Sequence, residues 1–296
     1  MTGNACIGID LGGTKIRTGI VDRRGELLSI PITIETGAKD PVEVILNRII
    51  GSVEKAVEDL GISVLETGGI GIGCTGPVDI TSGTILECPQ LPTMHFFSLQ
   101  KVIEDHFNLP VLLNNDANCL VYGESMFGAA SDKQDVAGFT LGTGIGCGIV
   151  INKKIFAGAT GSAAEIWPSP YKSGIIEDYV SGAGVSRSYR SLSGMERSSF
   201  EIYRLATDGD QTAIKVWKEF GAHLAVPIAW AINLIDPEVV VLGGSVATAY
   251  PYFRASMEEK LRNWICPVPA ERTKVVLSEF GDNAGVIGAA CLMMEG

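Results

Sequence analysis

The sequence predicts an α/β protein made of two domains of like design. Short apolar runs typical of strands alternate along the 296 residues with segments of helical periodicity. In addition, DLGGTKIRTGIVD (Asp10 to Asp22) aligns with TLGTGIGCGIVIN (Thr140 to Asn152) at a constant offset of 130. Both segments have the pattern of a strand, a glycine-rich turn and a second strand, which predicts an internal duplication. We expect domains at 1–115 and 116–281, and the pattern leaves open whether a last helix, about 282–296, packs back on the first.

The first half predicts a three-stranded meander followed by alternating helices and strands. The clearest helix spans Asp40 to Leu60, because its apolar residues recur every three to four positions. We expect Asp40 to cap this helix, Pro41 to take its first position, Glu43 to complete a capping box and Gly61 to end it. The expected meander strands are 5–9, 16–21 and 26–34; the later elements are strands at 69–74 and 110–114 and helices at 98–107 and 116–127.

The second half predicts one long helix, from about Thr212 to Ile235, that should kink at Pro227. A strand at Val239 to Leu242 follows and ends in Gly243 and Gly244. Asp282 is expected to cap the last helix.

Charge and cysteine usage exclude several classes of protein. The net charge of −11 and a pI near 4.8 argue against a nucleic-acid surface. The seven cysteines form no C-x-x-C pair, so we expect reduced, buried thiols in a cytoplasmic protein. No signal peptide and no apolar run of about 20 residues occurs, which predicts no association with membranes.

The two glycine-rich turns are candidate phosphate sites. Backbone N–H groups of such a turn can converge on an anion. The first turn also has the carboxylate of Asp10 at the strand end and the hydroxyl of Thr14, a combination suited to phosphates and a hydrated Mg²⁺. A plain glycine hairpin is the alternative. GIGCTG, from Gly71 to Gly76, runs into Pro77 rather than a helix, so a Rossmann dehydrogenase is not expected, and no P-loop motif is present.

Three further stretches carry candidate binding or catalytic groups. In VLLNNDANCL, Asp116 follows a buried strand between Asn115 and Asn118, where a carboxylate can take a proton from a substrate hydroxyl, or can merely cap the next helix. Glu165 and Glu177 lie in a glycine- and serine-rich stretch and could accept hydrogen bonds from sugar hydroxyls, or could be surface residues. Gly243 and Gly244 would let an adenine ring lie against backbone.

Together these motifs resemble the ROK family of sugar kinases, within the actin-like ATPase superfamily. The resemblance rests on DLGGTK, GPVD, LLNNDANCLVYGE, LGTGIGCGI, GSAAE, EDYVSG and VLGGSV, in this order. It implies two actin-like (ribonuclease H-like) domains, each a mixed sheet flanked by helices, around an interdomain cleft that binds ATP and Mg²⁺ with the sugar beside them. It further implies a glucokinase-like phosphotransferase with an alcohol group as acceptor, and a homodimer.

The resemblance also implies a role for each matched residue. Asp116 matches the catalytic base that deprotonates the sugar hydroxyl, and Asp10 matches the group that holds Mg²⁺ through water. The residues matching ATP contacts are Asp10, Gly12, Gly13, Thr14, Lys15, Gly142, Thr143, Gly144, Gly243 and Gly244. Those matching the sugar site are Gly76, Asn115, Asp116, Glu165 and Glu177.

Departures from the family pattern cluster on the sugar side. Family members usually continue Gly-Glu-x-Gly-His into a zinc-binding cysteine motif, whereas Pro168 stands here in place of the histidine and the cysteines are missing. We therefore expect no zinc site. Our hypothesis is that Trp167, Pro168 and Pro170 hold this loop by packing and that sugar preference shifts as a consequence. Gln90 replaces a common asparagine, and His95 or Phe96 stands near a usual tryptophan.

Several functions remain open at this level. A hexose kinase is favoured, and glucose, N-acetylmannosamine, allose, fructose or a glycoside could be the acceptor. A sugar-binding, kinase-like protein with weak or no catalysis is a second possibility, and a polyphosphate-using glucokinase a third, although no Lys/Arg run is available to hold a polyanion. A sugar-sensing repressor is disfavoured, since the first strand starts at Ala5 and leaves no room for a helix-turn-helix segment.

Overall fold

The computed structural model describes residues 5–294, which form two compact units. The first comprises residues 5–134, 148–164 and 278–294, and the second residues 135–147 and 165–277. These units describe packing, and the domain limits expected from the sequence duplication, 1–115 and 116–281, stay a prediction.

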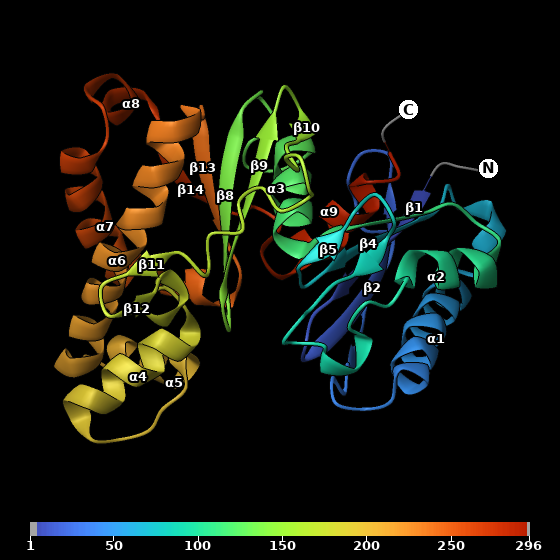
Figure 1. Ribbon diagram of the computed structural model, residues 1–296, viewed down its shortest axis with the longest axis horizontal. Helices are drawn as coiled ribbons and strands as arrows, with labels where there is room; N and C mark the ends of the chain where they lie inside the picture. Colours follow the sequence, from blue (N-terminus) through green and yellow to red (C-terminus); the bar gives the residue numbers. More distant parts are fainter. Residues whose placement is uncertain (1–4, 295–296) are drawn as a thin grey trace. The chain divides into compact units, whose positions relative to one another are not determined.

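The first sheet has five strands in the order β3-β2-β1-β4-β7 (Figure 1). The pairs β1–β2 and β2–β3 are antiparallel, whereas β1–β4 and β4–β7 are parallel. The strands are β1 (Ala5–Leu11), β2 (Lys15–Asp22), β3 (Ile32–Glu35), β4 (Ile70–Cys74) and β7 (Val111–Asn115). The predicted meander is confirmed, but its third strand begins at Ile32 rather than Glu26. Pro31, directly before β3, has no N–H to give to a ladder.

The two faces of β1 and β4 carry different residues because they meet different partners. Ile7 and Ile9 point into the core that contains Ile45 and Ile49 of helix α1 (Val42–Leu60). On the other face, a Cβ added at Gly8 would lie 2.0 Å from Val286 O, and one at Gly71 would lie 1.8 Å from Ala289 O. The alternation of isoleucine and glycine therefore allows the backbone of α9 (Ala284–Cys291) to pack directly on the sheet.

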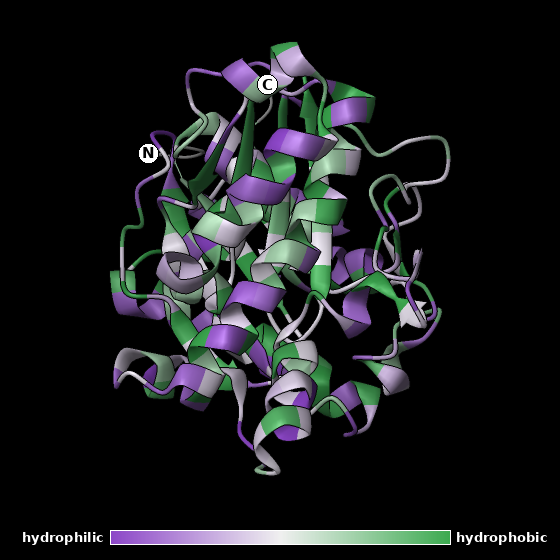
Figure 2. Ribbon diagram, turned by 90° about the vertical axis from the view of Figure 1, so that its left-hand side faces the viewer, coloured by the Kyte–Doolittle hydropathy of each residue, from purple (hydrophilic) through white to green (hydrophobic). Residues whose placement is uncertain are grey.

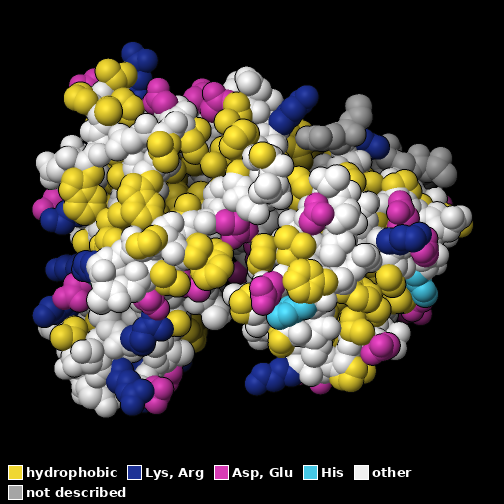
Figure 3. All heavy atoms as spheres, in the orientation of Figure 1, with side chains coloured by type: hydrophobic (Ala, Val, Ile, Leu, Met, Phe, Trp, Pro, Cys, Tyr) yellow, Lys and Arg dark blue, Asp and Glu magenta, His cyan; other side chains and the backbone are white. Residues whose placement is uncertain are grey.

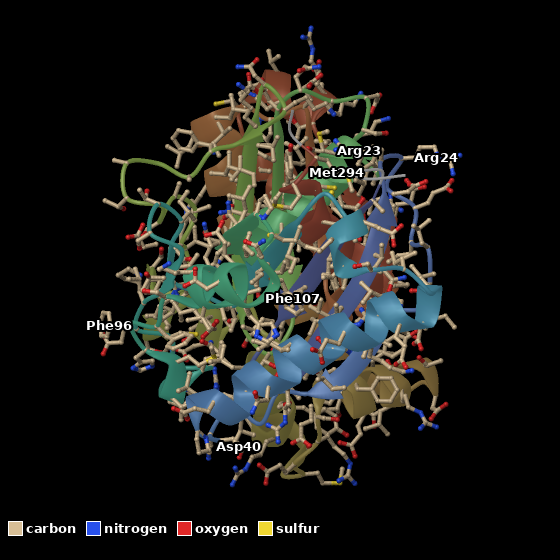
Figure 4. All side chains as sticks on the ribbon, turned by 90° about the vertical axis from the view of Figure 1, so that its right-hand side faces the viewer. Arg23, Arg24, Asp40, Phe96, Phe107 and Met294 are labelled. Atoms are coloured by element: carbon tan, nitrogen blue, oxygen red, sulfur yellow. The ribbon has the colours of Figure 1, made fainter. Side chains whose placement is uncertain are left out.

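Two predicted helix caps are wrong. Helix α1 begins after Pro41 without a side-chain cap, because the carboxylate of Asp40 accepts a hydrogen bond from Arg48 Nη1 at 2.6 Å instead. Asp40 is labelled at the beginning of α1 in Figure 4. Gly61 ends α1 in the left-handed conformation, with φ 65°, as predicted. Asn283 rather than Asp282 precedes α9, since Asp282 lies in the short 3₁₀ turn η5 (Gly281–Asn283).

A buried glutamate connects helix α3 (Asp116–Met126) to the segment that leads into α9. Glu124 is fully buried, and its carboxylate accepts hydrogen bonds from Ser278 Oγ at 2.5 Å and from the backbone N–H groups of Ala129, Glu279 and Phe280. A buried carboxylate is tolerated where several donors satisfy it. The remaining strands and helix of this part are β5 (Val78–Asp79), β6 (Thr84–Ile85) and α2 (Leu99–Phe107).

The second sheet repeats the order of the first. Its strands follow the order β10-β9-β8-β13-β14, so that each strand takes the place of its counterpart in the first sheet. They are β8 (Val136–Leu141), β9 (Ile145–Ile151), β10 (Lys154–Ile155), β13 (Val239–Gly243) and β14 (Lys274–Leu277). The hairpins β1–β2 and β8–β9 are the two copies of the sequence repeat. The predicted duplication is confirmed, and both sheets are mixed.

Helices of the second unit pack around aromatic side chains. Helix α6 (Gln211–Ile235) runs through Pro227 as one continuous helix and lies against α7 (Tyr250–Trp264). The rings of Trp217 and Phe220 meet edge to face at 5.5 Å. Figure 2 looks onto these helices and shows polar and apolar residues alternating along them. The other elements are α4 (Gly182–Ser193), α5 (Ser199–Thr207), α8 (Pro267–Arg272), β11 (Pro170–Tyr171) and β12 (Gly174–Ile175).

The cysteines agree with the expectation of buried thiols, except for Cys266. On the face shown in Figure 3, basic and acidic side chains both occur across the surface. The seven cysteines are all free thiols, six of them buried and Cys266 exposed. Between residues 5 and 294, no helix combines the length and the apolar character that crossing a membrane requires.

Candidate functional site

Two predicted acids lie at the carboxyl edge of the first sheet. Asp10 near the end of β1 pairs with Gly73 of β4, which in turn pairs with Asn114 of β7. Asp116 follows β7 directly as the first residue of α3. Two strand spacings of about 4.8 Å separate the backbone of Asp10 from that of Asn114. The sheet thus places the predicted magnesium group and the predicted base at one edge, where α/β proteins bind ligands.

The carboxylates of Asp10 and Asp116 contribute to the raised pKa values of two nearby cysteines. Burial raises the pKa of the Cys119 thiol well above its usual value, and the charges of Asp116 and Asp10 raise it further. The same two carboxylates add to the raised pKa of Cys74, after burial and the neighbouring Cys88. Gly73 makes room for this arrangement, because a Cβ there would lie 3.1 Å from Cys119 Sγ and 3.6 Å from Asp116 Cα.

Asp10 has the properties of a carboxylate suited to a cation. Burial raises its pKa from 3.8 to about 6, and the nearby Arg17 guanidinium offsets this only in part. Arg17 lies opposite Asp10 in the β1–β2 ladder and donates hydrogen bonds to Asp282 O and to Asn283 Oδ1. A Cβ at Gly285 would approach the Asp10 carboxylate to 2.8 Å, so α9 leaves space there. A desolvated carboxylate in such a place fits a hydrated Mg²⁺, which would stabilise its charged form.

The start of helix α3 is capped by Asn115, not by Asp116. The Asn115 side chain accepts hydrogen bonds from Ala117 N at 2.8 Å and Asn118 N at 3.4 Å. Asp116 is the first helical residue, is partly exposed, and accepts from Ala117 N at 2.7 Å. The alternative in which Asp116 serves as the cap is therefore wrong. Asn118 does not surround Asp116 as expected, because its Nδ2 donates to Asn114 Oδ1 at 3.0 Å.

The first glycine turn is closed by its own backbone. Gly12 N donates to Lys15 O at 3.0 Å, while Thr14 and Lys15 are exposed. Thr36 secures the turn through its hydroxyl, which donates to Gly12 O at 2.7 Å. A Cβ at Gly13 would lie 2.9 Å from Gln90 O, so the residue that departs from the family pattern touches this turn.

The second glycine turn is joined to one of the predicted sugar-binding acids. Gly142 N donates to Gly144 O at 3.0 Å, and Gly182 N donates to Gly142 O at 2.8 Å. Glu177 Oε2 accepts a hydrogen bond from Ile145 N at 3.1 Å, and a Cβ on Gly144 would lie only 2.2 Å from that oxygen. Thr143 at the tip is exposed. The structure thus brings Glu177 against the predicted phosphate turn, which no sequence pattern indicated.

Trp167 links the two glutamates. Its side chain hydrogen-bonds to the Glu165 carboxylate, and its backbone O accepts from Glu177 N at 3.3 Å. Burial raises the pKa of Glu165, Trp167 opposes this, and the charge of Glu177 adds to it. Burial also raises the pKa of Glu177. Trp167 is only partly buried, so its hydrogen bonds as well as its apolar surface hold the loop.

Of the remaining predicted residues, Gly244 has a clear structural reason to be glycine. Gly244 has φ 87°, and a Cβ there would lie 2.5 Å from Leu141 O; Gly243 pairs with Thr140. Gly76 lies in the loop between β4 and β5. His95 Nε2 is 2.8 Å from Cys88 O, and Phe96 is 69% exposed and points away from the ribbon in Figure 4. Among residues 5–294, no group of three or more His, Cys, Asp or Glu is placed to hold a metal ion.

The predicted site residues therefore form two groups. Asp10, the first glycine turn, Gly76, Asn115 and Asp116 belong to the first unit, and the second turn, Glu165, Glu177, Gly243 and Gly244 belong to the second. Sequence reasoning missed Arg17 and Gly285 beside Asp10. The hairpin register offered a signal for Arg17, because a turn closed between Gly12 and Lys15 sets position 17 opposite position 10.

Two mixed five-stranded sheets flanked by helices, with acids and glycine turns at strand ends, define an actin-like α/β fold. The sequence profile of the ROK family matches residues 6–295, and the chain belongs to this family. Its relatives include a glucokinase of Thermotoga maritima, 28% identical over 98% of this chain and 97% of the relative. An N-acetyl-D-glucosamine kinase of Photobacterium profundum is 29% identical over 97% of this chain and 99% of the relative.

A solved structure supports the same assignment. The fold matches that of a ROK family glucokinase from Streptomyces griseus, solved in complex with glucose and AMPPNP, with a TM-score of 0.87. The two chains are 29% identical over 99% of this chain and 100% of the other. In family and fold, this chain is a glucokinase-like ROK sugar kinase.

Proposed function

We propose that the protein phosphorylates a hexose or hexose derivative with ATP. The observation that carries this proposal is that Asp10 and Asp116 both lie at the carboxyl ends of strands in one sheet. Asn115, rather than Asp116, caps helix α3. Glucose and N-acetylglucosamine are the first acceptors to test, because they are the substrates that the names of the relatives give.

Asp116 is proposed as the general base. Its carboxylate would accept the proton of the attacking sugar hydroxyl, and a positioned base of this kind contributes about 10²- to 10⁴-fold to a rate. Asp10 would hold Mg²⁺ through water, and the ion would neutralise charge on the phosphates of the nucleotide. The glycine turns, with Thr14, Lys15 and Thr143, are proposed to contact the phosphates, and Gly243 and Gly244 the adenosine.

Glu165 and Glu177 are proposed to bind the sugar together with Asn115 and the Gly76 loop. Carboxylates accept strong hydrogen bonds from hydroxyl groups. The raised pKa values of both glutamates indicate partly desolvated carboxylates, in which such bonds gain strength.

A coupled assay with ATP across hexoses and amino sugars tests the proposal. We expect turnover with at least one sugar, and we expect Asp116→Asn to lower kcat by about 10²- to 10⁴-fold while ATP still binds. Asp59→Asn on the surface of α1, which removes a comparable carboxylate from an exposed ion pair with Lys55, is the matched control and should keep its activity. Sugar binding without turnover of any acceptor would favour a kinase-like binding protein instead.

A further inference from the structure

A short hairpin carries Glu177 into place. Strands β11 and β12 pair through Pro170–Ile175 and Tyr171–Gly174, and β12 leads directly into the 3₁₀ turn η3 (Ile176–Asp178) that contains Glu177. Ile176 N donates to Ser169 O at 2.9 Å. The position of the Glu177 carboxylate therefore depends on what holds this hairpin.

Two tyrosine rings of the hairpin segment meet a histidine ring from helix α6. Tyr171 and Tyr179 are in edge contact at 5.2 Å, and each meets the ring of His223 on α6, at 5.7 and 5.2 Å respectively. The hydroxyl of Tyr171 lies 3.0 Å from His223 Nδ1. The hairpin and η3 are thus connected to a long helix by both ring contacts and a hydrogen bond.

Lys172 lies beside His223 and over both tyrosine rings. Its Nζ lies 3.5 Å from His223 Nε2 and within 5.6 and 5.2 Å of the centres of the Tyr171 and Tyr179 rings. An ammonium group only donates, so a hydrogen bond to Nε2 would leave the proton of the neutral imidazole on Nδ1, facing the Tyr171 oxygen.

The hairpin and η3 have further contacts and also border a cavity. Ser173 Oγ lies 2.8 Å from the Tyr179 hydroxyl, Ile175 N donates to Asp178 Oδ2 at 3.0 Å, and Arg187 of α4 pairs with Asp178. A cavity of about 470 Å³ lies between Ser173 and Gly174 of the hairpin and helices α4 and α6, and Tyr179 and His223 line it. The ring contacts and the hydrogen bond to His223 connect this segment to α6, beside its ion pair with Arg187 of α4.

We propose that Tyr171, Tyr179 and His223, with Lys172 over the rings, form a clamp that positions Glu177 for sugar binding. The inference rests on the proposed function, because it takes Glu177 as a sugar contact. The clamp residues act through Glu177 and are positioning residues: they hold η3 so that Glu177 Oε2 meets Ile145 N.

The first test needs no activity. Hydrogen exchange of the amides at Ile176 and Glu177 is compared in the wild type, Tyr171→Phe and His223→Phe, which keep a ring but lose the hydrogen bond. We expect exchange to be about threefold to tenfold faster in both variants. Tyr252→Phe is the matched control, since it removes a tyrosine hydroxyl bonded to Thr207 Oγ1 elsewhere in the same unit. Unchanged exchange at these two amides in both clamp variants would overturn the clamp, whether or not the protein turns over a sugar.

The second test asks whether the clamp acts through Glu177. In the active enzyme, Tyr171→Phe should raise the KM for the sugar by about threefold to tenfold with the KM for ATP nearly unchanged. Added to Glu177→Gln, the same change should raise the sugar KM no further. Independent, multiplying effects would assign Tyr171 a general structural role and refute the positioning role. If the wild type phosphorylates no sugar, the proposed function fails while the exchange result still decides the clamp.

Discussion

The two glycine turns come from the same repeat but are supported in different ways. The first follows Asp10, a buried acid at the end of β1, and is secured by the hydroxyl of Thr36. In the second, Thr140 stands at the position of Asp10, and support comes from Gly182 N and from the Glu177 carboxylate. Duplication preserved the hairpin, while the groups around each turn diverged. The difference agrees with the proposal that Asp10 holds Mg²⁺ beside the first turn and that Glu177 binds the sugar beside the second.

Replacing Asp10 should have the largest effect on activity, and replacing Thr140, its counterpart in the repeat, should have little. Asp10→Asn removes the charge proposed to hold hydrated Mg²⁺, and we expect kcat/KM for MgATP to fall by about 100-fold or more, the loss expected of a group that stabilises transferring phosphate. Thr140→Val, at the same place in the repeat, should change it by less than about threefold. Steady-state kinetics at varied Mg²⁺ make the comparison, and equal losses from both changes would remove the distinction between the turns.

A methyl group added at Gly144 should have an intermediate effect. Its Cβ would displace the Glu177 carboxylate, whose oxygen lies 2.2 Å away, and so break the hydrogen bond to Ile145 N. Losing one such bond corresponds to about a threefold to tenfold rise in the sugar KM. Gly51→Ala, on helix α1 and outside the predicted site, is the control, because a Cβ there has no atom within 4 Å. If both alanine variants behave like the wild type, Glu177 does not depend on this turn.

The stability of the folded protein should also depend on pH through His223. Burial and then the Lys172 ammonium lower the pKa of His223 from 6.5 to about 4. The unfolded chain therefore binds a proton at His223 between about pH 6.5 and 4 that the folded chain refuses, and stability falls as the pH drops through this range. His223 contacts Tyr171, Lys172 and Tyr179, and the charged residues Asp178, Arg187 and Glu219 line the same cavity.

Thermal unfolding measures this effect. The Tm difference between the wild type and His223→Phe should be largest near pH 7 and shrink by a few degrees toward pH 5, because only the wild type carries the titrating ring. Carboxylates that titrate in the same range are present in both proteins and cancel. A Tm difference that stays constant from pH 7 to 5 would show that His223 does not titrate as described.

Zinc removal should have the smallest effect. The stretch between Glu165 and Glu177 is held by Trp167 and the clamp residues, so we expect no stoichiometric zinc by metal analysis. A zinc-selective chelator in the presence of excess Mg²⁺ should leave Tm unchanged and turnover within about twofold of its starting value. Stoichiometric zinc, lost together with sugar binding, would overturn this expectation.

Much of the fold follows from local sequence patterns. Where a helix cap differs, a neighbouring residue makes the hydrogen bonds instead. The 130-residue offset predicts two like sheets, and the helical period predicts α1 and α6. The cap expected at Asp40 failed because Arg48, two turns into the helix, takes its carboxylate. The alternative in which Asp116 caps α3 is wrong because Asn115, one residue closer to the strand, accepts from the N–H groups of Ala117 and Asn118.

The candidate site also combines features that the sequence shows with contacts that only the tertiary structure shows. Sequence alone determined which residues could do chemistry, because strand ends, glycine turns and acids are read over a few positions. Only the tertiary structure decided that Asp10 and Asp116 share one sheet edge, that Glu177 meets the turn at Gly144, and that Tyr171 bonds to His223 on α6. These contacts join residues 33 to 106 positions apart. Such contacts arise from strand order and helix packing, which bury the chain as a whole and leave no local periodicity to read.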